Sequence, residues 1–307
     1  MADLSIATQG IPAVYEWGIE LIRAVQTIAS PPLTVVMHFI TDFGGKIAYL
    51  ILLPFLFWCI DERRSMRLAV AFILGAWSNS AVKEFFGHPR PFDYDASVKL
   101  AHESSPGLPS GHTQNATTFW GILFSWSRNR GFRILCVALP LVIAFTRIYL
   151  GVHFPTDLFA AWALAAVTLL AYYTLASRIE GLFATLDFRF RILLVALIAV
   201  GMNALLPGDP TLGGLFFGMG TGFILMRKHC DFSASSRGSE RLPRPLVLAL
   251  RLLLGLTVTA AIYAGLKAIL PGEESDWHTL GRFLRYTLLG AWVAFGAPFA
   301  FRKLALA

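Results

Sequence analysis

Three short clusters of polar residues interrupt long apolar stretches of this sequence. Ionisable side chains beside bilayer-spanning segments are costly, so each cluster needs a functional reason. The alternation of spans predicts that all three clusters reach the same side of the membrane. In chain order they are Lys83 with Arg90-Pro91, then Pro109-Ser110-Gly111-His112, then Arg147, His153 and Asp157.

The cations of these clusters, Lys83, Arg90 and Arg147, suit a tetrahedral oxyanion such as phosphate. Arginine offers forked donors and lysine a point charge, so together they can form an anion-binding cage. Ser110 and Gly111 stand at the expected start of a helix, where free N–H groups and the positive end of the helix dipole attract anions. Each residue alone has a simpler interpretation, an interfacial cation or an ordinary serine cap. Their convergence favours a phosphate site.

The two histidines supply groups for phosphoryl transfer. His153 and Asp157 are four residues apart, so a helix that begins near Pro155 lets the carboxylate turn back and fix the imidazole tautomer. A neutral, oriented imidazole is a nucleophile, and its attack on phosphorus gives a phosphohistidine. His112, across the site, is then expected to protonate the departing alkoxide and later to activate water.

With these residues in place, the sequence resembles the type 2 phosphatidic acid phosphatase (PAP2) superfamily, which includes the vanadium haloperoxidases. One position departs from the family pattern, because Thr146 stands where serine is usual, and threonine keeps the hydroxyl. The resemblance rests on three motifs in the family's order, Lys83-x6-Arg90-Pro91, Pro109-Ser110-Gly111-His112 and Arg147-x5-His153-x3-Asp157.

The resemblance implies a helical core and metal-independent hydrolysis, with no cofactor and no metal site. It implies His153 as the nucleophile, His112 as the general acid and base, and Asp157 as the partner that orients the nucleophile. It also implies that phosphate is held by the remaining motif residues, which are Lys83, Arg90, Ser110, Gly111 and Arg147.

The elements that position these motifs are expected to be transmembrane helices. Of the 307 residues 56% are hydrophobic and 15% charged, and the mean hydropathy is +0.61, so the natural solvent of the chain is a bilayer. A spanning helix needs roughly 20 mostly apolar residues, and about nine such windows recur. The sequence therefore predicts an all-α fold, a polytopic transmembrane helical bundle with a PAP2-like core and additional C-terminal transmembrane helices. The windows are residues 43–60, 66–86, 113–127, 133–150, 156–177, 190–207, 211–226, 246–270 and 283–301.

Three regions follow from this pattern. Residues 1–42 are expected to form an interfacial amphipathic region, because apolar residues from Ile11 to Ala29 repeat at helical spacing among charged ones. Pro31-Pro32 is expected to break the helix, and residues 42–46 to form a polar segment that faces water or a protein cavity.

Residues 43–178 are expected to form the PAP2-like catalytic membrane core. Residues 179–307 are expected to add transmembrane helices, with a cytoplasmic linker near 230–245 that is rich in Ser, Arg, Gly and Pro. For the added helices three interpretations stay open: the interface of a homodimer, a lipid access route, or a second small domain.

The formal charge of +7 follows the positive-inside bias of membrane proteins. Basic residues gather in loops after the odd-numbered spans, so these loops are predicted to be cytoplasmic and the motifs to face outside. Aromatic and basic residues do not interleave, and nucleic acid is therefore not an expected partner. In a bacterial cell the chain would be a multi-pass protein of the inner membrane with its active site towards the periplasm. The basic loop residues are Arg63, Arg64, Arg67, Arg128, Arg130, Arg178, Arg189, Arg227, Lys228, Arg237, Arg241 and Arg244.

Because the motifs open at the outer interface, the expected partner is a membrane lipid whose phosphate lies at headgroup level. The predicted function is hydrolysis of a lipid phosphomonoester or pyrophosphate, with phosphatidic acid, phosphatidylglycerophosphate, undecaprenyl pyrophosphate and sphingoid-base phosphates as candidate substrates. Two alternatives stay open, a lipid phosphotransferase that uses the same phosphohistidine and a non-catalytic lipid or anion transporter. A transporter would need the cations but not the pairing of His153 with Asp157.

Overall fold

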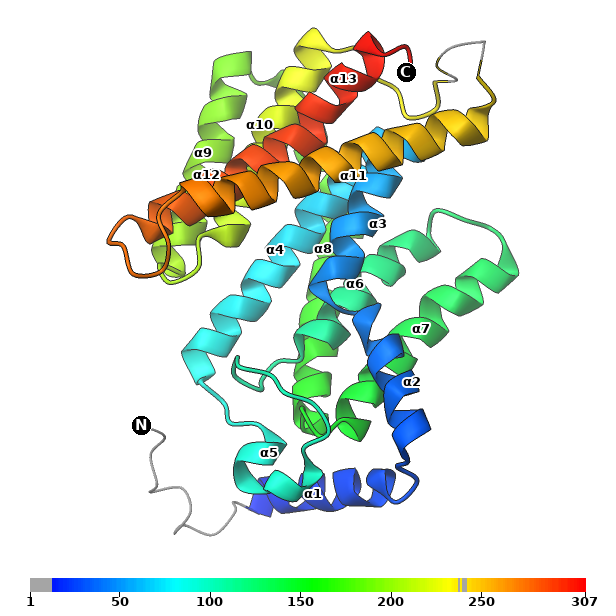
Figure 1. Cartoon of the computed structure of the whole chain (residues 1–307), viewed down its shortest axis with the longest axis vertical. Coiled ribbons are helices and arrows are strands. Elements are labelled where there is room, and N and C mark those ends of the chain that lie inside the picture. The colour runs from blue at the N-terminus through cyan, green and yellow to red at the C-terminus, as the bar shows by residue number, and fades with distance from the viewer. Residues whose placement is uncertain (1–12, 237, 239–241) are drawn as a thin grey trace. The chain divides into compact units, whose positions relative to one another are not determined.

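The computed structural model describes residues 13–236, 238 and 242–307 (Figure 1). Within these residues the chain is helical and contains no strand, which confirms the predicted all-α class. Arg237, Arg241 and the beginning of the expected interfacial region lie outside the described residues.

The helices follow one another with mostly short connections. In chain order they are α1 (Ala13–Gln26), α2 (Pro31–Asp42), α3 (Lys46–Cys59), α4 (Glu62–Phe86), α5 (Pro91–Tyr94), the 3-10 turn η2 (Ala96–Val98), α6 (Gly111–Phe124), α7 (Arg130–Tyr149), α8 (Pro155–Thr185), α9 (Phe188–Leu205), α10 (Thr211–His229), α11 (Arg244–Ile269), α12 (His278–Ala291), the π-helical segment η3 (Trp292–Gly296) and α13 (Ala297–Lys303).

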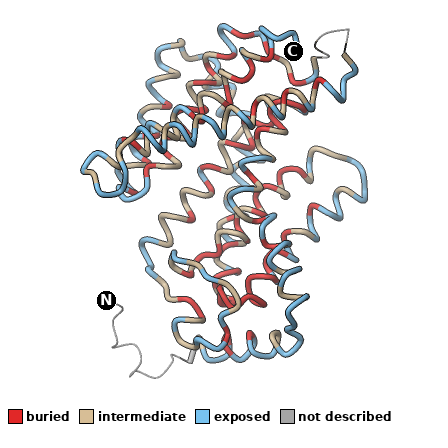
Figure 2. Tube along the Cα trace, viewed as in Figure 1, coloured by how far each residue is buried: buried red, intermediate tan, exposed pale blue. Residues whose placement is uncertain are grey.

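The chain divides into two compact units. The first comprises Met1–Tyr49 and Leu74–Ala171, and the second comprises Leu50–Ile73 and Tyr172–Ala307. All the motif residues belong to the first unit. Buried positions in this unit gather on α6, at the end of α7 and at the start of α8 (Figure 2).

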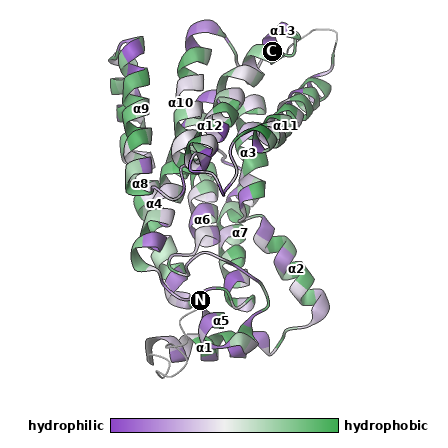
Figure 3. Ribbon diagram, turned by 60° about the vertical axis from the view of Figure 1, so that its left-hand side comes forward, coloured by the Kyte–Doolittle hydropathy of each residue, from purple (hydrophilic) through white to green (hydrophobic). Residues whose placement is uncertain are grey.

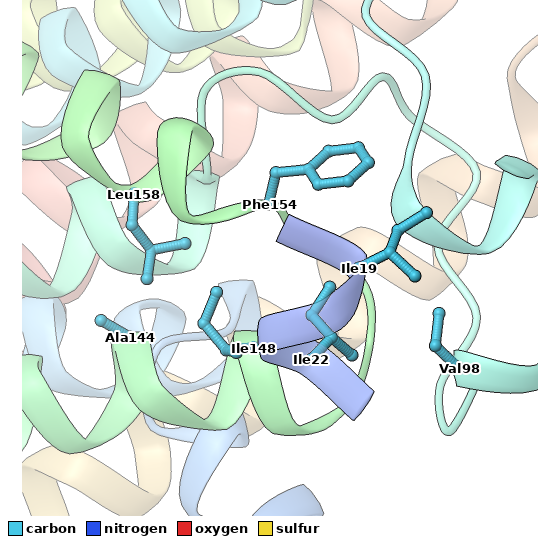
Figure 4. Close-up of a cluster of buried hydrophobic side chains, with 7 residues drawn as sticks. All are labelled: Ile19, Ile22, Val98, Ala144, Ile148, Phe154 and Leu158. Atoms are coloured by element: carbon cyan, nitrogen blue, oxygen red, sulfur yellow. The ribbon is translucent and has the colours of Figure 1, made fainter. Parts of the chain in front are cut away.

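The N-terminal helices pack onto the loops that carry the motifs. Ile19 and Ile22 of α1 join a buried apolar cluster that also holds Ile148 at the end of α7 and Phe154 just before α8 (Figure 4). The side chain of Gln26 donates hydrogen bonds to two backbone carbonyls, those of Val98 and Tyr149, at 2.8 Å each. Burial of this apolar face, together with these bonds, fixes α1 beside the α7–α8 turn.

The chain breaks between α1, which ends at Gln26, and α2, which begins at Pro31, so the break expected at Pro31-Pro32 is present. Pro31 and Pro32 are also the first two residues of α2, because proline lacks the N–H that the first turn of a helix leaves unpaired. The hydroxyl groups of Thr34 and Tyr149 are hydrogen-bonded at 2.9 Å, which ties α2 to the end of α7.

Four described helices, α7, α8, α9 and α11, are long and apolar enough to cross a membrane unaided. A fifth crossing results if α2 and α3, bent by 43° at a three-residue break, count as one span. Apolar residues predominate on α9 and α11 (Figure 3). The chain is a multi-pass membrane protein. The motif helices α4 and α6 give weaker apolar signals, because α4 carries charged residues at both ends and α6 has only 14 residues.

In the second unit α10 and α12 approach closely. An added Cβ at Gly214 would lie 2.6 Å from the carbonyl oxygen of Phe283, and one at Gly218 would overlap that of Thr287. Glycines four residues apart thus give α10 a flat face, as in other tightly paired membrane helices. Arg251 of α11 is fully buried in the same unit. Its guanidinium donates to four backbone carbonyls, those of Trp58, Ala234, Ser236 and Leu306.

Candidate active site

The turn between α7 and α8 positions His153 against Asp157. Gly151 has a φ of +68°, and a Cβ at this position would overlap the carbonyl oxygen of Val98, so the turn requires glycine. The Nδ1 atom of His153 lies 3.1 Å from Oδ2 of Asp157, which also accepts the backbone N–H of Phe154 at 2.9 Å. Both side chains are buried. The carboxylate thus holds Nδ1–H and leaves the lone pair of Nε2 towards the site.

The start of α6 lies beside this pair. Ser110 caps the helix, and its Oγ accepts the hydroxyl of Thr113 at 3.0 Å. The N–H of Ser110 donates to the backbone carbonyl of Asp157 at 3.1 Å, which ties the second motif to the third. At Gly111 the nearest atom to an added Cβ is Oδ1 of Asn79, at 3.4 Å. The start of α6, with its unpaired N–H groups, therefore lies next to Asp157 in the first turn of α8.

The cations of the first motif contact the loop before α6. Lys83 Nζ donates to the carbonyl oxygens of Pro106 and, at 3.2 Å, of Gly107. Arg90 donates through Nε to the carbonyl of Ser105 at 2.6 Å and through Nη2 to that of Pro106 at 3.3 Å. Arg90 Nη1 also lies 3.3 Å from Nε2 of His153, so its charge directly faces the candidate nucleophile.

Arg147 of α7 completes the cationic group. Its side chain is 2% exposed and forms an ion pair with Glu103 of the loop before α6. Its Nη1 donates to the hydroxyl of Thr41, at the end of α2, over 2.9 Å. Among the described residues no acceptor is found for its buried Nε, which leaves one donor for a ligand. The hydroxyl of Thr146 donates to the carbonyl of Ile143 at 2.6 Å and so stays within its own helix.

His112 faces these groups from the first turn of α6 and is half-buried. Among the contacts of the described residues, its ring takes part in no hydrogen bond. An imidazole without a fixed partner is able to accept or deliver a proton at an incoming group. The backbone of Gly45 lies near the ring, because an added Cβ at Gly45 would lie 3.7 Å from Nε2 of His112.

Burial and nearby positive charges favour the unprotonated form of His153. Burial lowers the pKa of His153 well below its ordinary value, and the charge of Arg90 lowers it further. Burial also lowers the pKa of Arg90. For Glu103 burial, the largest single cause, acts to raise the pKa, but the charge and hydrogen bond of Arg147 together with the charges of His112 and Arg90 outweigh it, and the pKa ends below its usual value. Glu103 is therefore a carboxylate at neutral pH.

The structure thus brings the eight predicted site residues together in one unit, in the arrangement that their spacing indicated. Sequence reasoning missed Glu103 and Thr41, which both contact Arg147. Glu103 lies 44 residues before Arg147 and Thr41 lies 106 residues before it, so no local spacing could reveal either contact. A carboxylate nine positions before His112, in a loop with few other charges, was the available signal for Glu103.

Comparison with protein families matches two parts of the chain. The PAP2 superfamily model matches residues 64–180, which contain all three motifs. A second model, the transmembrane extension of PAP2 superfamily phosphatases, matches residues 210–307. The matches leave out α1, α2 and α3, and so the residues around Thr41 and Gly45.

Curated relatives resemble about half of the chain. The probable sphingosine-1-phosphate phosphatase of Dictyostelium discoideum is 26% identical over 190 residues, which cover 57% of this chain and 47% of that protein. Phosphatidylglycerophosphatase B of Bacillus subtilis (strain 168) is 27% identical over 155 residues, covering 46% of this chain and 74% of that protein. The chain spans less than half the length of the sphingosine-1-phosphate phosphatases it matches.

Two solved structures are similar over half of the chain. The transmembrane PAP2-type phosphatidylglycerolphosphate phosphatase of Bacillus subtilis has a TM-score of 0.48 and 24% identity, covering 56% of this chain and 90% of that one. LpxE of Aquifex aeolicus has a TM-score of 0.47 and 26% identity, covering 51% of this chain and 94% of that one.

Proposed function

The chain belongs to the PAP2 superfamily, and from this premise we propose that it is an integral membrane lipid phosphatase that works through a phosphohistidine. The single observation that carries the proposal is the contact between Nδ1 of His153 and Oδ2 of Asp157, at 3.1 Å, with Nε2 turned towards Arg90. A site that only bound anions would need the cations but not an imidazole with a fixed tautomer.

In the first step Nε2 of His153 attacks the phosphorus atom of the substrate. A bond forms between nitrogen and phosphorus, and the bond between phosphorus and the leaving oxygen breaks. His112 gives its proton to that oxygen, and Asp157 stabilises the charge that develops on the His153 ring. Contacts with Lys83, Arg90 and Arg147 offset the negative charge on the transferring group.

In the second step water takes the place of the leaving group. His112, now neutral, accepts a proton from water as the oxygen attacks phosphorus, and the bond to His153 breaks. Inorganic phosphate remains on the three cations, on the hydroxyl of Ser110 and on the N–H of Gly111. No metal ion or cofactor has a part in either step.

The substrate is proposed to be a lipid phosphomonoester or pyrophosphate. The names of the relatives support sphingoid-base phosphates and phosphatidylglycerophosphate, and another relative, the putative undecaprenyl-diphosphatase YbjG of Escherichia coli (strain K12), supports a polyprenyl diphosphate. All three classes of lipid are found in the bilayer, where a multi-pass protein can bind them. We place the site at the periplasmic face of a bacterial inner membrane, because the basic loops mark the opposite face as cytoplasmic.

The test is phosphate release from a panel of these lipids by the detergent-purified protein in the presence of EDTA. Wild type is compared with His153→Ala and with His229→Ala, a matched histidine removal at the last residue of α10 in the second unit. We expect His153→Ala to abolish release while His229→Ala retains it. Quenching with alkaline detergent and radiolabelled substrate should trap a base-stable, acid-labile phosphoprotein in the wild type.

Each other outcome decides against a part of the proposal. Release that requires an added divalent cation contradicts the metal-independent mechanism. Transfer of the label to an added alcohol but not to water indicates a phosphotransferase. Tight vanadate binding without turnover of any lipid favours a transporter.

A further inference from the structure

The break between α2 and α3 forms one wall of the site. Residues 43–45 separate the two helices, and each of their N–H groups bonds to a carbonyl three residues back, those of Ile40, Thr41 and Asp42, over 2.8 to 3.2 Å. This turn stands directly against His112, although the PAP2 match begins only at residue 64.

Two glycines make this approach possible. An added Cβ at Gly44 would lie 2.7 Å from Cγ2 of Ile143 and 3.3 Å from Cβ of His112. An added Cβ at Gly45 would lie 3.7 Å from Nε2 of His112. Neither glycine has a positive φ, so other residues could adopt the backbone conformation. What glycine provides at these positions is space beside the catalytic ring rather than an unusual turn.

The end of α2 is held firmly against the same site. The hydroxyl of Thr41 is 4% exposed and accepts Nη1 of Arg147 at 2.9 Å. Further back along α2, Leu33 and Met37 pack on the buried cluster of Tyr149, Leu150 and Val152. The space at Gly45 therefore has walls on α2, α6 and α7 that are fixed relative to the phosphate-binding cations.

Apolar side chains flank this space on the outer surface of the unit. Phe43 is 40% exposed and Ile47 is 74% exposed, on either side of Gly44 and Gly45. Phe39, one turn earlier on α2, is 65% exposed. In a membrane-spanning chain such surfaces face lipid tails, so the break lies at an apolar surface and also next to the ring of His112.

We propose that the break between α2 and α3 is the binding site for the leaving group of the substrate, with Gly45 keeping the space beside His112 open and Phe43 and Ile47 supporting the lipid chain. The assignment rests on the proposed function. The phosphate lies on Lys83, Arg90 and Arg147, and the ester oxygen points to Nε2 of His112. When the bond from phosphorus to this oxygen breaks, His112 donates its proton there, and the neutral lipid alcohol leaves past Gly45.

The first experiment separates the leaving group from the phosphate. Gly45→Ala should lower kcat/KM for a long-chain lipid phosphate by roughly tenfold or more, because a methyl group enters the space of the ester oxygen and crowds the carbonyl of Asp42. Inhibition by vanadate, which has no leaving group, should stay within about twofold of wild type. The matched control is Gly265→Ala on α11, where an added Cβ meets no atom within 4 Å and both quantities should stay unchanged.

The second experiment changes Ile47, which is proposed to contact the lipid chain. Because its side chain is exposed, its substitution leaves the packing of the protein intact. Ile47→Ser should raise KM for a long-chain phosphomonoester and leave KM for butyl phosphate unchanged. If Gly45→Ala fails to bind vanadate, its fold is damaged. In that case the effect of Ile47→Ser on KM is the test of the leaving-group site. An active wild type whose chain-length preference is unaltered by either variant overturns this assignment alone. A wild type that hydrolyses no lipid phosphate overturns the proposed function together with it.

Discussion

Arg147 of α7, which is buried, and Glu103 of the loop before α6, which is half-buried, form an ion pair in the candidate site. The same loop offers the carbonyls of Ser105, Pro106 and Gly107 to Lys83 and Arg90. One short segment, residues 103–107, thus supplies a carboxylate and three carbonyl oxygens to the three cations that are proposed to hold phosphate. A substrate phosphate must displace these oxygens, and the free energy of that displacement reduces its net binding.

Glu103→Gln should therefore strengthen anion binding. Removal of the carboxylate leaves Arg147 without its charged partner, and an incoming oxyanion then gains the full charge-assisted contact. We expect vanadate to inhibit the variant at roughly tenfold lower concentration than wild type. Glu274→Gln, the same change on the loop between α11 and α12, is the control and should leave inhibition unaltered. Weaker inhibition of Glu103→Gln would instead identify Glu103 as a support that orients Arg147.

Asp157→Asn should leave the site formed but nearly inactive. The Oδ2 atom accepts both His153 Nδ1–H and the N–H of Phe154, and an asparagine whose amide nitrogen took this place would force the proton onto Nε2. We expect kcat to fall by roughly a hundredfold to ten-thousandfold, as when the orienting carboxylate of a catalytic triad is lost. Vanadate inhibition should persist.

The control for Asp157→Asn is Asp61→Asn, because Asp61 also accepts a backbone N–H three residues ahead, that of Arg64 at 2.8 Å, but has no histidine partner. Its kcat should match wild type. An Asp157→Asn enzyme with undiminished kcat would show that the tautomer of His153 does not limit the reaction.

Arg251→Ala should destabilise the second unit. The guanidinium is fully buried and bonds to four carbonyls from the end of α3, the segment after α10 and the C-terminus. Truncation leaves these acceptors unpaired, which costs at least about 3 kcal/mol. We expect a clearly lower Tm in detergent, while Arg244→Ala, an exposed position on the same helix, should keep the Tm of wild type. Equal Tm values for the two variants would mean that water replaces the lost donors.

The motif spacing was sufficient to predict which residues lie near one another in the candidate site, for a physical reason. Asp157 lies one helical turn after His153, and Ser110-Gly111 starts a helix, so local geometry alone determines what these residues face. That Lys83, Arg90 and Arg147 lie close together was predicted from the topology of the spans. This prediction requires only that the ends of the helices that carry them reach the same side of the membrane. Contacts such as Thr41 with Arg147 depend on the packing of α2 against α7, and no periodicity in the sequence encodes that packing.

The helical class was predictable from hydropathy, but the start of the first span was not. Pro31-Pro32 was interpreted as a helix break, and the chain does break between α1 and α2, but both prolines also lie in the first turn of α2, a helix that hydropathy did not predict. The same dipeptide is compatible with either role, because proline ends a preceding helix and begins a following one equally well. A second break, within the polar segment expected at residues 42–46, lies at Phe43, Gly44 and Gly45, next to His112.

The acid limb of the pH profile should lie well below the ordinary range of histidine. Burial disfavours the charged ring of His153 and Arg90 repels it, so its pKa is lowered and the neutral, nucleophilic form persists as the pH falls. When kcat/KM is divided by the fraction of substrate present as the dianion, it should show no loss between pH 7 and about 6, although an unperturbed imidazole would be mostly protonated at the lower value.

Arg90→Gln provides the matched test of the cause. Removal of the positive charge 3.3 Å from Nε2 should raise the pKa of His153, and its acid limb should therefore move to higher pH than in wild type. Substrate binding will weaken as well, because Arg90 is one of the proposed phosphate ligands, but a uniform loss of binding changes the height of the profile and not its midpoint. The midpoint can be measured independently from the ring nitrogen shifts of labelled histidine, with His153→Gln to assign the resonance. A wild-type midpoint near 6.5, unaltered in Arg90→Gln, would mean that neither burial nor Arg90 controls the protonation of the nucleophile.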